Sequence, residues 1–290
     1  MRAGAPSDNG VTVRFPEQMP GSLKEEVQEQ LFSKRFEMPN LPHVATQALV
    51  MAQDEMSTSA SLAQLICKDQ SLATNLLRIA NSPAYAGSRA IVSLQQAITR
   101  LGMQTIAELA ITICVKGSVF PKKAYAEISA GLWTHSLASA LFAKEIARQQ
   151  RRNVEAAYLC GLLHRIGMPL VLKAVTDVRQ DKKDQPSSED VEELLAALHV
   201  DIGLVATERW QLPSQVAVAI RYSQSYESAE QHRHLAAVVN LSQALASALL
   251  DGNGFEHVAN LPVLDELSMY PDQLADVVGN QERIQLAVAS

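Results

Sequence analysis

Two histidines in this chain could contribute ring nitrogens to a metal or phosphate site. His135 lies in Leu-Trp-Thr-His-Ser and His164 in Gly-Leu-Leu-His. Carboxylates usually complete a hydrolytic metal site of this kind, because they hold the cation while it activates water. Arg165, which follows His164 directly, carries a permanent positive charge and has no lone pair. At about 4 Å and an effective dielectric constant near 20, like unit charges repel by roughly 4 kcal/mol. Arg165 would therefore repel a divalent cation if it points inward, but not if it points to solvent.

Other polar clusters offer weaker sites. Asp201 could substitute for a missing carboxylate near His199, but positions i and i+2 face apart on a helix. His232 and His234 could chelate a metal only outside a helix, and we expect them at the start of one. Arg148, with the basic pair that follows at 151–152, is expected to complement a helix dipole, although a phosphate-bearing ligand or an acidic partner could use it.

The composition limits the classes of partner. The chain has 290 residues, 47% of them hydrophobic, and a net charge of −6. This balance disfavours broad binding of nucleic-acid phosphates, which needs clustered Lys and Arg. The apolar runs are too short to span a bilayer, so no membrane association is expected. Three scattered cysteines among apolar residues (Cys67, Cys114 and Cys160) are typical of reduced core thiols, and we expect a cytoplasmic protein.

Sequence signals for helix starts and helix ends recur along the whole chain. Capping patterns occur at Ser22, Asp69, Ser93 and Ser187, each ahead of an apolar stripe with helical spacing. Further helices are expected from about 105, at 133–149, 156–165, 191–210, 213–222, about 235–250, and around 274–278 and 284–288. Breaks are expected at 81–83, at Gly117 with 121, at 167 with 169, across a charged loop at 179–190, and at 251–254. Period-two alternation is scarce, so the sequence predicts an all-α fold.

The segment at 62–80 could pass for a helix-turn-helix that reads DNA. Its second helix carries one basic residue, Arg78, and the chain is acidic. Core packing is therefore the preferred interpretation of this segment, and nucleic acid is not expected as a partner.

Several separated motifs form an ordered set. They are Leu-Pro-His-Val at 41–44, DQSLATNLLRIANSPAY at 69–85, IVSLQQAITRLG at 91–102, Leu-Trp-Thr-His-Ser at 132–136, Gly-Leu-Leu-His at 161–164, Ile-Gly at 202–203 and Trp-Gln-Leu-Pro at 210–213. Over roughly residues 38–250 this set resembles the HDOD domain family. The resemblance implies an all-α domain of two lobes, the second similar to HD phosphohydrolases, in a bacterial regulatory or signalling module.

Composition and the resemblance together predict boundaries along the chain. Residues 1–21, rich in Pro and Gly, would form a mobile tail, and the resemblance implies an N-terminal helical lobe at 22–127 and an HD-like lobe at 128–253. Residues 254–290 would form a short C-terminal helical extension.

The HD pattern can be followed residue by residue. His135 and His164 match its two histidine positions, whereas Arg165 replaces the aspartate of the doublet. The later aspartate falls nearest to Gln243, and Ser-Gln at 223–224 stands where related sequences often carry two histidines. The resemblance thus implies vestiges of a metal site with both carboxylates absent. No catalytic residue, metal or cofactor is expected.

Three functions remain open from the sequence. The preferred one is a non-catalytic regulator or scaffold that binds signalling proteins, whose identity the sequence does not give. A second is a divergent metal-dependent phosphohydrolase with a rearranged site. In the third, the pocket senses a small nucleotide without cleaving it, with Arg165 holding a phosphate beside His135 and His164. The sequence leaves homo-oligomerisation open.

Overall fold

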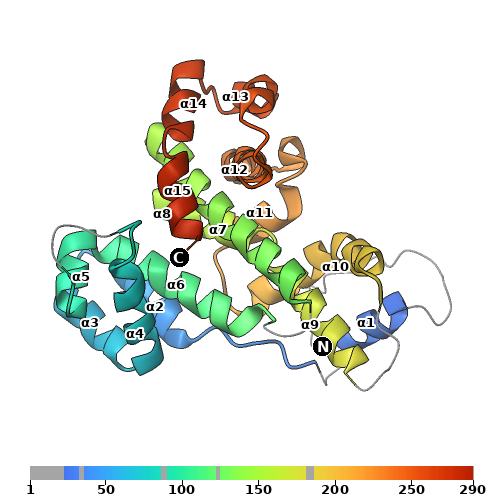
Figure 1. The fold of residues 1–290 in the computed structure, drawn as a ribbon, viewed down its shortest axis with the longest axis horizontal. Coiled ribbons are helices and arrows are strands. Elements are labelled where there is room, and N and C mark those ends of the chain that lie inside the picture. Colours follow the sequence, from blue (N-terminus) through green and yellow to red (C-terminus); the bar gives the residue numbers. More distant parts are fainter. Residues whose placement is uncertain (1–22, 33–35, 86–89, 122–124, 181–185, 290) are drawn as a thin grey trace, which may run out of the picture.

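The computed structural model describes residues 23–32, 36–85, 90–121, 125–180 and 186–289. All regular structure in these ranges is helical, which confirms the all-α prediction (Figure 1). The expected mobile tail at 1–21 and the expected cap at Ser22 lie outside the described residues.

In chain order, the helices form three groups along the sequence. The first group is α1 (Leu23–Phe32), α2 (His43–Gln53), α3 (Ser59–Cys67), α4 (Gln70–Ala80), α5 (Leu94–Leu101) and α6 (Met103–Val119). The second is α7 (Ala126–Gln149), α8 (Val154–Leu163), α9 (Gly167–Arg179), α10 (Ser188–Arg209), α11 (Ser214–Tyr222) and α12 (Arg233–Asp251). The third is α13 (Val263–Glu266), α14 (Pro271–Val278) and α15 (Gln281–Val288), and two short 3-10 turns lie at Tyr226–Ser228 and Glu256–Asn260.

Three helix starts show the side-chain caps that the sequence predicts. The Leu72 amide donates to Asp69 Oδ1 at 2.9 Å and opens α4. The amides of Gln96 and Asp190 donate to the hydroxyls of Ser93 at 3.2 Å and Ser187 at 3.1 Å, at the starts of α5 and α10. Each cap satisfies an amide that has no partner within its helix and stabilises the fold by about 1 kcal/mol.

One predicted helix end is confirmed and one is wrong. Helix α6 passes through Gly117, because a glycine inside a helix weakens it without stopping it, and it ends at Val119, just before the predicted break at Pro121. Gly167 and Pro169 begin α9 instead of ending the preceding helix, since proline is tolerated in a first turn where its missing N–H has no acceptor. Arg179, predicted as the first residue of the charged loop, is the last residue of α9, and residues 181–185 of that predicted loop lie outside the described residues.

Gly167 has a packing role that the sequence pattern does not reveal. A Cβ atom at this position would lie 1.8 Å from the carbonyl oxygen of His199 and 2.9 Å from the amide nitrogen of Gly203. The absence of a side chain therefore lets the start of α9 lie directly against α10.

The molecule has three arms that meet at α7 (Figure 1). Helices α2 to α6 form one arm, α1, α9 and α10 the opposite arm, and α12 to α15 the third. Helix α1 lies beside α9, and Glu26 pairs with Arg179 at 3.0 Å. Helix α7 serves both hydrophobic cores, with Trp133 and Leu137 in the one shared with α6, and Phe142 in the one shared with α12 and α14.

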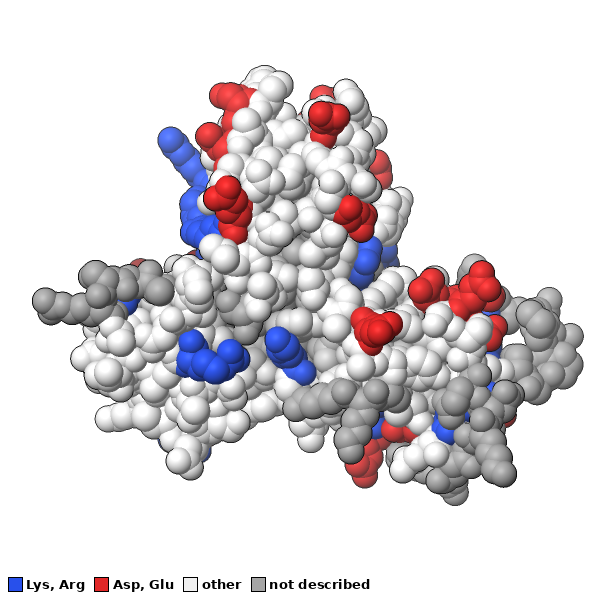
Figure 2. All heavy atoms as spheres, viewed as in Figure 1, with Lys and Arg blue, Asp and Glu red and all other residues white. Residues whose placement is uncertain are grey.

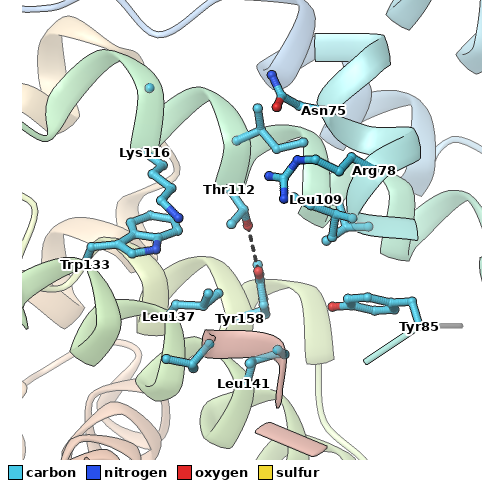
Figure 3. Close-up of a pocket in the computed structure, with 15 residues that line it drawn as sticks. Asn75, Arg78, Tyr85, Leu109, Thr112, Lys116, Trp133, Leu137, Leu141 and Tyr158 are labelled. Carbon is cyan, nitrogen blue, oxygen red and sulfur yellow. Dashed lines mark hydrogen bonds between the residues drawn. The ribbon is translucent and has the colours of Figure 1, made fainter. Parts of the chain in front are cut away.

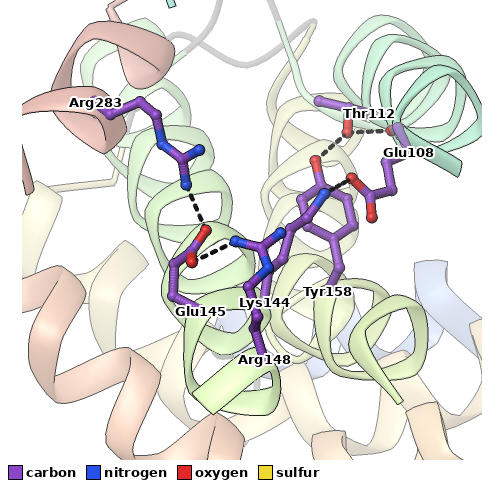
Figure 4. A network of polar contacts seen from close by, with 7 residues as sticks. All are labelled: Glu108, Thr112, Lys144, Glu145, Arg148, Tyr158 and Arg283. Atoms are coloured by element: carbon purple, nitrogen blue, oxygen red, sulfur yellow. Dashed lines mark hydrogen bonds and ion pairs between the residues drawn. The ribbon is translucent and has the colours of Figure 1, made fainter. Parts of the chain in front are cut away.

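Polar contacts join α6 to α7 and α8 (Figure 4). Lys144 on α7 pairs with Glu108 on α6, whose side chain is buried. The hydroxyls of Thr112 on α6 and Tyr158 on α8 lie 2.7 Å apart. These contacts cross the boundary predicted at residue 127, and the hydrophobic core that runs from α1 to α11 is continuous across it as well.

Two further predictions, on the helix-turn-helix-like segment and on the cysteines, can be compared with the structure. Leu62 and Leu76 of the helix-turn-helix-like segment are fully buried, as core packing requires. Cys114 and Cys160 are buried, and burial raises their pKa values to about 11 and about 12. Cys67 is exposed at the end of α3, so its assignment as a core thiol is wrong.

One stretch, Val154–Arg179, is apolar and long enough to span a membrane by composition and length alone. Most of its most hydropathic window (78%) is buried inside the protein. Such burial is typical of a core helix.

Candidate functional site

Three helices bring the predicted site residues together. His135 lies on α7, His164 directly follows α8, and Gln243 lies on α12. The ring centroids of His135 and His164 are 5.9 Å apart. All three side chains are buried, His164 almost completely at 1% exposure.

Arg165 points into this site rather than to solvent. Its guanidinium donates a hydrogen bond to Gln243 Oε1 at 3.1 Å. The same oxygen accepts a hydrogen bond from Gln224 Nε2 at 3.0 Å. Arg165 and Gln243, which the resemblance matches to the carboxylate positions of the HD pattern, thus bind each other.

The hydrogen bonds of the two histidines differ. His164 Nδ1 lies 2.7 Å from the carbonyl oxygen of Gly161, so this nitrogen carries the proton and donates it. His164 Nε2 therefore holds a lone pair, and it has no partner among the described residues. The two ring nitrogens of His135 lie 3.3 Å from Ser247 Oγ and 3.4 Å from Ser139 Oγ.

The two serines were missed in the sequence. Each lies four residues after a predicted site residue, Ser139 after His135 and Ser247 after Gln243. Helical spacing of i, i+4 places such pairs on one face and could have identified both.

The site disfavours positive charge. Burial, and then the charge of Arg165, lower the pKa of His135 to about 3. The same two causes, in the same order, lower the pKa of His164 below its usual range. Burial also lowers the pKa of Arg165. Both histidines are therefore neutral near pH 7, whereas Arg165 is the fixed charge of the site.

This donor set does not fit the divalent cation that HD phosphohydrolases hold. The lone pair of His164 Nε2 could bind a metal. The charged group beside it, however, is Arg165, whose positive charge would repel a cation. No group of three or more His, Cys, Asp or Glu residues within the described ranges is placed to hold a metal ion. The substitute set of His199 and Asp201 is not formed either, and His199 Nδ1 lies 3.0 Å from the carbonyl oxygen of Leu195 on its own helix.

Protein stability should fall at acidic pH because these histidines are buried in the neutral form. The folded-state pKa of His135, about 3, lies below its ordinary value of 6.5, so the unfolded chain takes up the proton first. The contribution of neutral His135 to the free energy of unfolding is complete above about pH 6.5 and is lost as the pH falls from there toward 3. At pH 5 one such histidine should lower the free energy of unfolding by about 2 kcal/mol. Urea unfolding of the wild type and His135→Gln at pH 7 and pH 5 measures this, and an equal loss in both proteins would refute it.

Comparisons with known proteins agree with this architecture. A model of the HDOD domain family matches residues 38–226, which is more than half of the chain. An uncharacterized protein from Treponema pallidum (strain Nichols) is 22% identical over 227 residues, which cover 74% of this chain and 43% of that protein. The chain therefore spans less than half the length of this curated relative.

Solved structures share the fold at low sequence identity. An HDOD domain protein of unknown function from Geobacter sulfurreducens has a TM-score of 0.69 and 22% identity, covering 93% of this chain and 99% of the other. A candidate metal-dependent phosphohydrolase from Shewanella amazonensis SB2B has a TM-score of 0.67 and 18% identity, covering 92% and 98%. A candidate signal transduction protein from Marinobacter aquaeolei VT8 has a TM-score of 0.65 and 22% identity, covering 94% and 67%.

Proposed function

This chain belongs to the HDOD domain family, and we propose that it is a non-catalytic regulatory protein of bacterial signal transduction that acts by binding other proteins in the cytoplasm. The hydrogen bond between Arg165 and Gln243 is the observation that carries the proposal. It joins a permanent cation to a neutral amide, at the two positions that we match to the anionic metal ligands of HD hydrolases.

The electrostatics of the pocket support the same function. A divalent cation near Arg165 would meet a repulsion of roughly 8 kcal/mol at 4 Å and an effective dielectric constant near 20. The neutral histidines carry no negative charge that would offset this repulsion. The fold then serves as a scaffold, and its output passes through another protein, which we take to be a signalling protein.

A phosphate-sensing role for the same pocket is the weaker candidate. A phosphate held by the Arg165 nitrogen that donates to Gln243 would displace this hydrogen bond, and the Gln243 oxygen would keep only its contact with Gln224. The loss of the Arg165 contact would offset part of the binding free energy.

Hydrolysis assays test the proposed function. Purified protein should be incubated with Mg²⁺, Mn²⁺ or Co²⁺ and with p-nitrophenyl phosphate, bis(p-nitrophenyl) phosphate or cyclic di-GMP. Because no metal is held, we expect rates within about twofold of those of His164→Ala and of the closer mimic His164→Gln. Rates ten or more times higher in the wild type than in both variants would overturn the proposal.

A further inference from the structure

A cavity of about 260 Å³ lies between the arm that contains α4 and α6 and the helices α7 and α8 (Figure 3). The last residues of α15, Ala287 and Val288, also line it. Its volume lies just below the roughly 300–1,000 Å³ that is usual for small-molecule sites, so a small ligand is expected. The cavity is distinct from the His135 and His164 site, since neither histidine lines it.

The walls of this interlobe cavity are largely apolar and aromatic. Trp133 and Leu137 of α7 form one side, with Leu109 of α6 opposite them (Figure 3). Tyr85 and Tyr158 add two further rings, and the hydroxyl of Tyr158 is already paired with Thr112. Such walls bind a flat apolar or aromatic body by contact and by exclusion of water.

The mouth of the cavity is positively charged. Lys116 and Arg78 both line it and both are exposed, whereas no Asp or Glu is among the described residues that line it. Lys116 Nζ lies 5.1 Å from the centre of the Trp133 ring. On the face shown in Figure 2, Lys and Arg are displayed over α6, whereas the other two arms display Asp and Glu together with Lys and Arg. This local charge contrasts with the net charge of −6 of the chain.

The two cations act on each other. Partial burial, and then the charge of Arg78, lower the pKa of Lys116. An anion placed between the two side chains would replace this repulsion by two charge-assisted contacts. The charge pattern of the mouth therefore favours an anionic ligand over a neutral or cationic one.

We propose that the interlobe cavity binds a small organic anion, an aromatic or apolar body that carries a single carboxylate or phosphate group. The body lies against Trp133 and Leu137, and the anionic group lies at the mouth beside Lys116 and Arg78. Because the ligand touches α6, α7 and α15 together, it stabilises their mutual packing. This inference does not rest on the proposed regulatory function and concerns a different part of the molecule.

Titrations with matched small probes test the proposal. Phenylphosphonate carries a phosphonate, a stable analogue of the phosphate group, and benzoate carries the carboxylate. Benzamide and benzylamine are their neutral and cationic counterparts. Trp133 is one of two tryptophans in the chain and lies in the cavity wall, so tryptophan fluorescence reports binding. We expect dissociation constants of about 1 mM or tighter for at least one anion. Binding of the two counterparts should be at least about tenfold weaker.

Variants of Lys116 test whether its positive charge binds the anionic group of the ligand. Lys116→Met keeps the apolar stem over Trp133 and should weaken binding of the anion about tenfold. Lys116→Arg, which keeps the charge, should retain affinity within about threefold. Lys68→Met removes an exposed lysine that does not line this cavity and should leave affinity unchanged. Thermal unfolding confirms that each variant is folded.

Three results would overturn the proposal. The first is no saturable change with either anion at concentrations of several millimolar. The second is equal binding of the neutral or cationic counterparts. The third is unchanged affinity in a folded Lys116→Met variant.

Discussion

Replacing Arg165 and Gln243 together by aspartate should convert a pocket that repels divalent cations into one that binds them. The local charge changes by three units, and the two new carboxylates join the neutral rings of His135 and His164, which lie 5.9 Å apart. Two histidines and two carboxylates form a donor set suited to Mn²⁺ or a similar ion. We expect affinity for Mn²⁺ at least about 100-fold above that of the wild type, since each 1.4 kcal/mol of removed repulsion is worth a factor of ten. Calorimetric titration measures it.

A neutral double variant distinguishes the effect of the new negative charge from the effect of the room left by the smaller side chains. Arg165→Asn with Gln243→Asn opens the same room but supplies no anion, so it should bind Mn²⁺ no better than the wild type. In the aspartate variant the pKa values of both histidines should rise, because the charge of Arg165 contributes to lowering them. If both double variants bound Mn²⁺ equally, the charge at these positions would not be what excludes the metal.

Gly167→Ala should be among the most destabilising single substitutions in this chain. The new methyl group would lie 1.8 Å from the carbonyl oxygen of His199 and 2.6 Å from its carbonyl carbon. These neighbours are backbone atoms of α10 and cannot turn aside, so α9 and α10 must separate. Overpacking of a well-packed core costs about 1–3 kcal/mol and occasionally more, and we expect at least 3 kcal/mol here. Chemical denaturation measures the loss.

Gly131→Ala is the matched control for this substitution. Gly131 also lies in a helix, but a Cβ atom there meets nothing within 4 Å. The alanine should stabilise α7 by about 0.5–1 kcal/mol, because glycine is the poorer helix former. A similar loss of stability in both variants would show that close approach at Gly167 is not the cause.

Much of the fold could be predicted from local signals. The caps at Asp69, Ser93 and Ser187 are visible in the sequence because each hydroxyl or carboxylate stands just ahead of an apolar stripe. Helix α9 was missed because Gly167 and Pro169 are typical of breaks. Whether glycine ends a helix or admits a neighbour depends on α10, more than twenty residues away, and no local pattern carries that information.

The same limit applies to the site. The sequence places His135, His164, Arg165 and Gln243 near one another only through the family resemblance. The direction of Arg165 depends on whether a distant acceptor is available, and Gln243 is that acceptor on another helix. The interlobe cavity draws its lining from α4, α6, α7, α8 and α15, and no spacing in the chain relates these segments.

Bound metal in the wild-type protein tests the central claim most directly. After equilibrium dialysis against Mn²⁺ and removal of the free ion, elemental analysis should find less than about a tenth of an equivalent per chain, since Arg165 occupies the site as a fixed cation. One equivalent of manganese that is lost in His164→Ala would contradict the account, because it would show that the pocket still holds a metal.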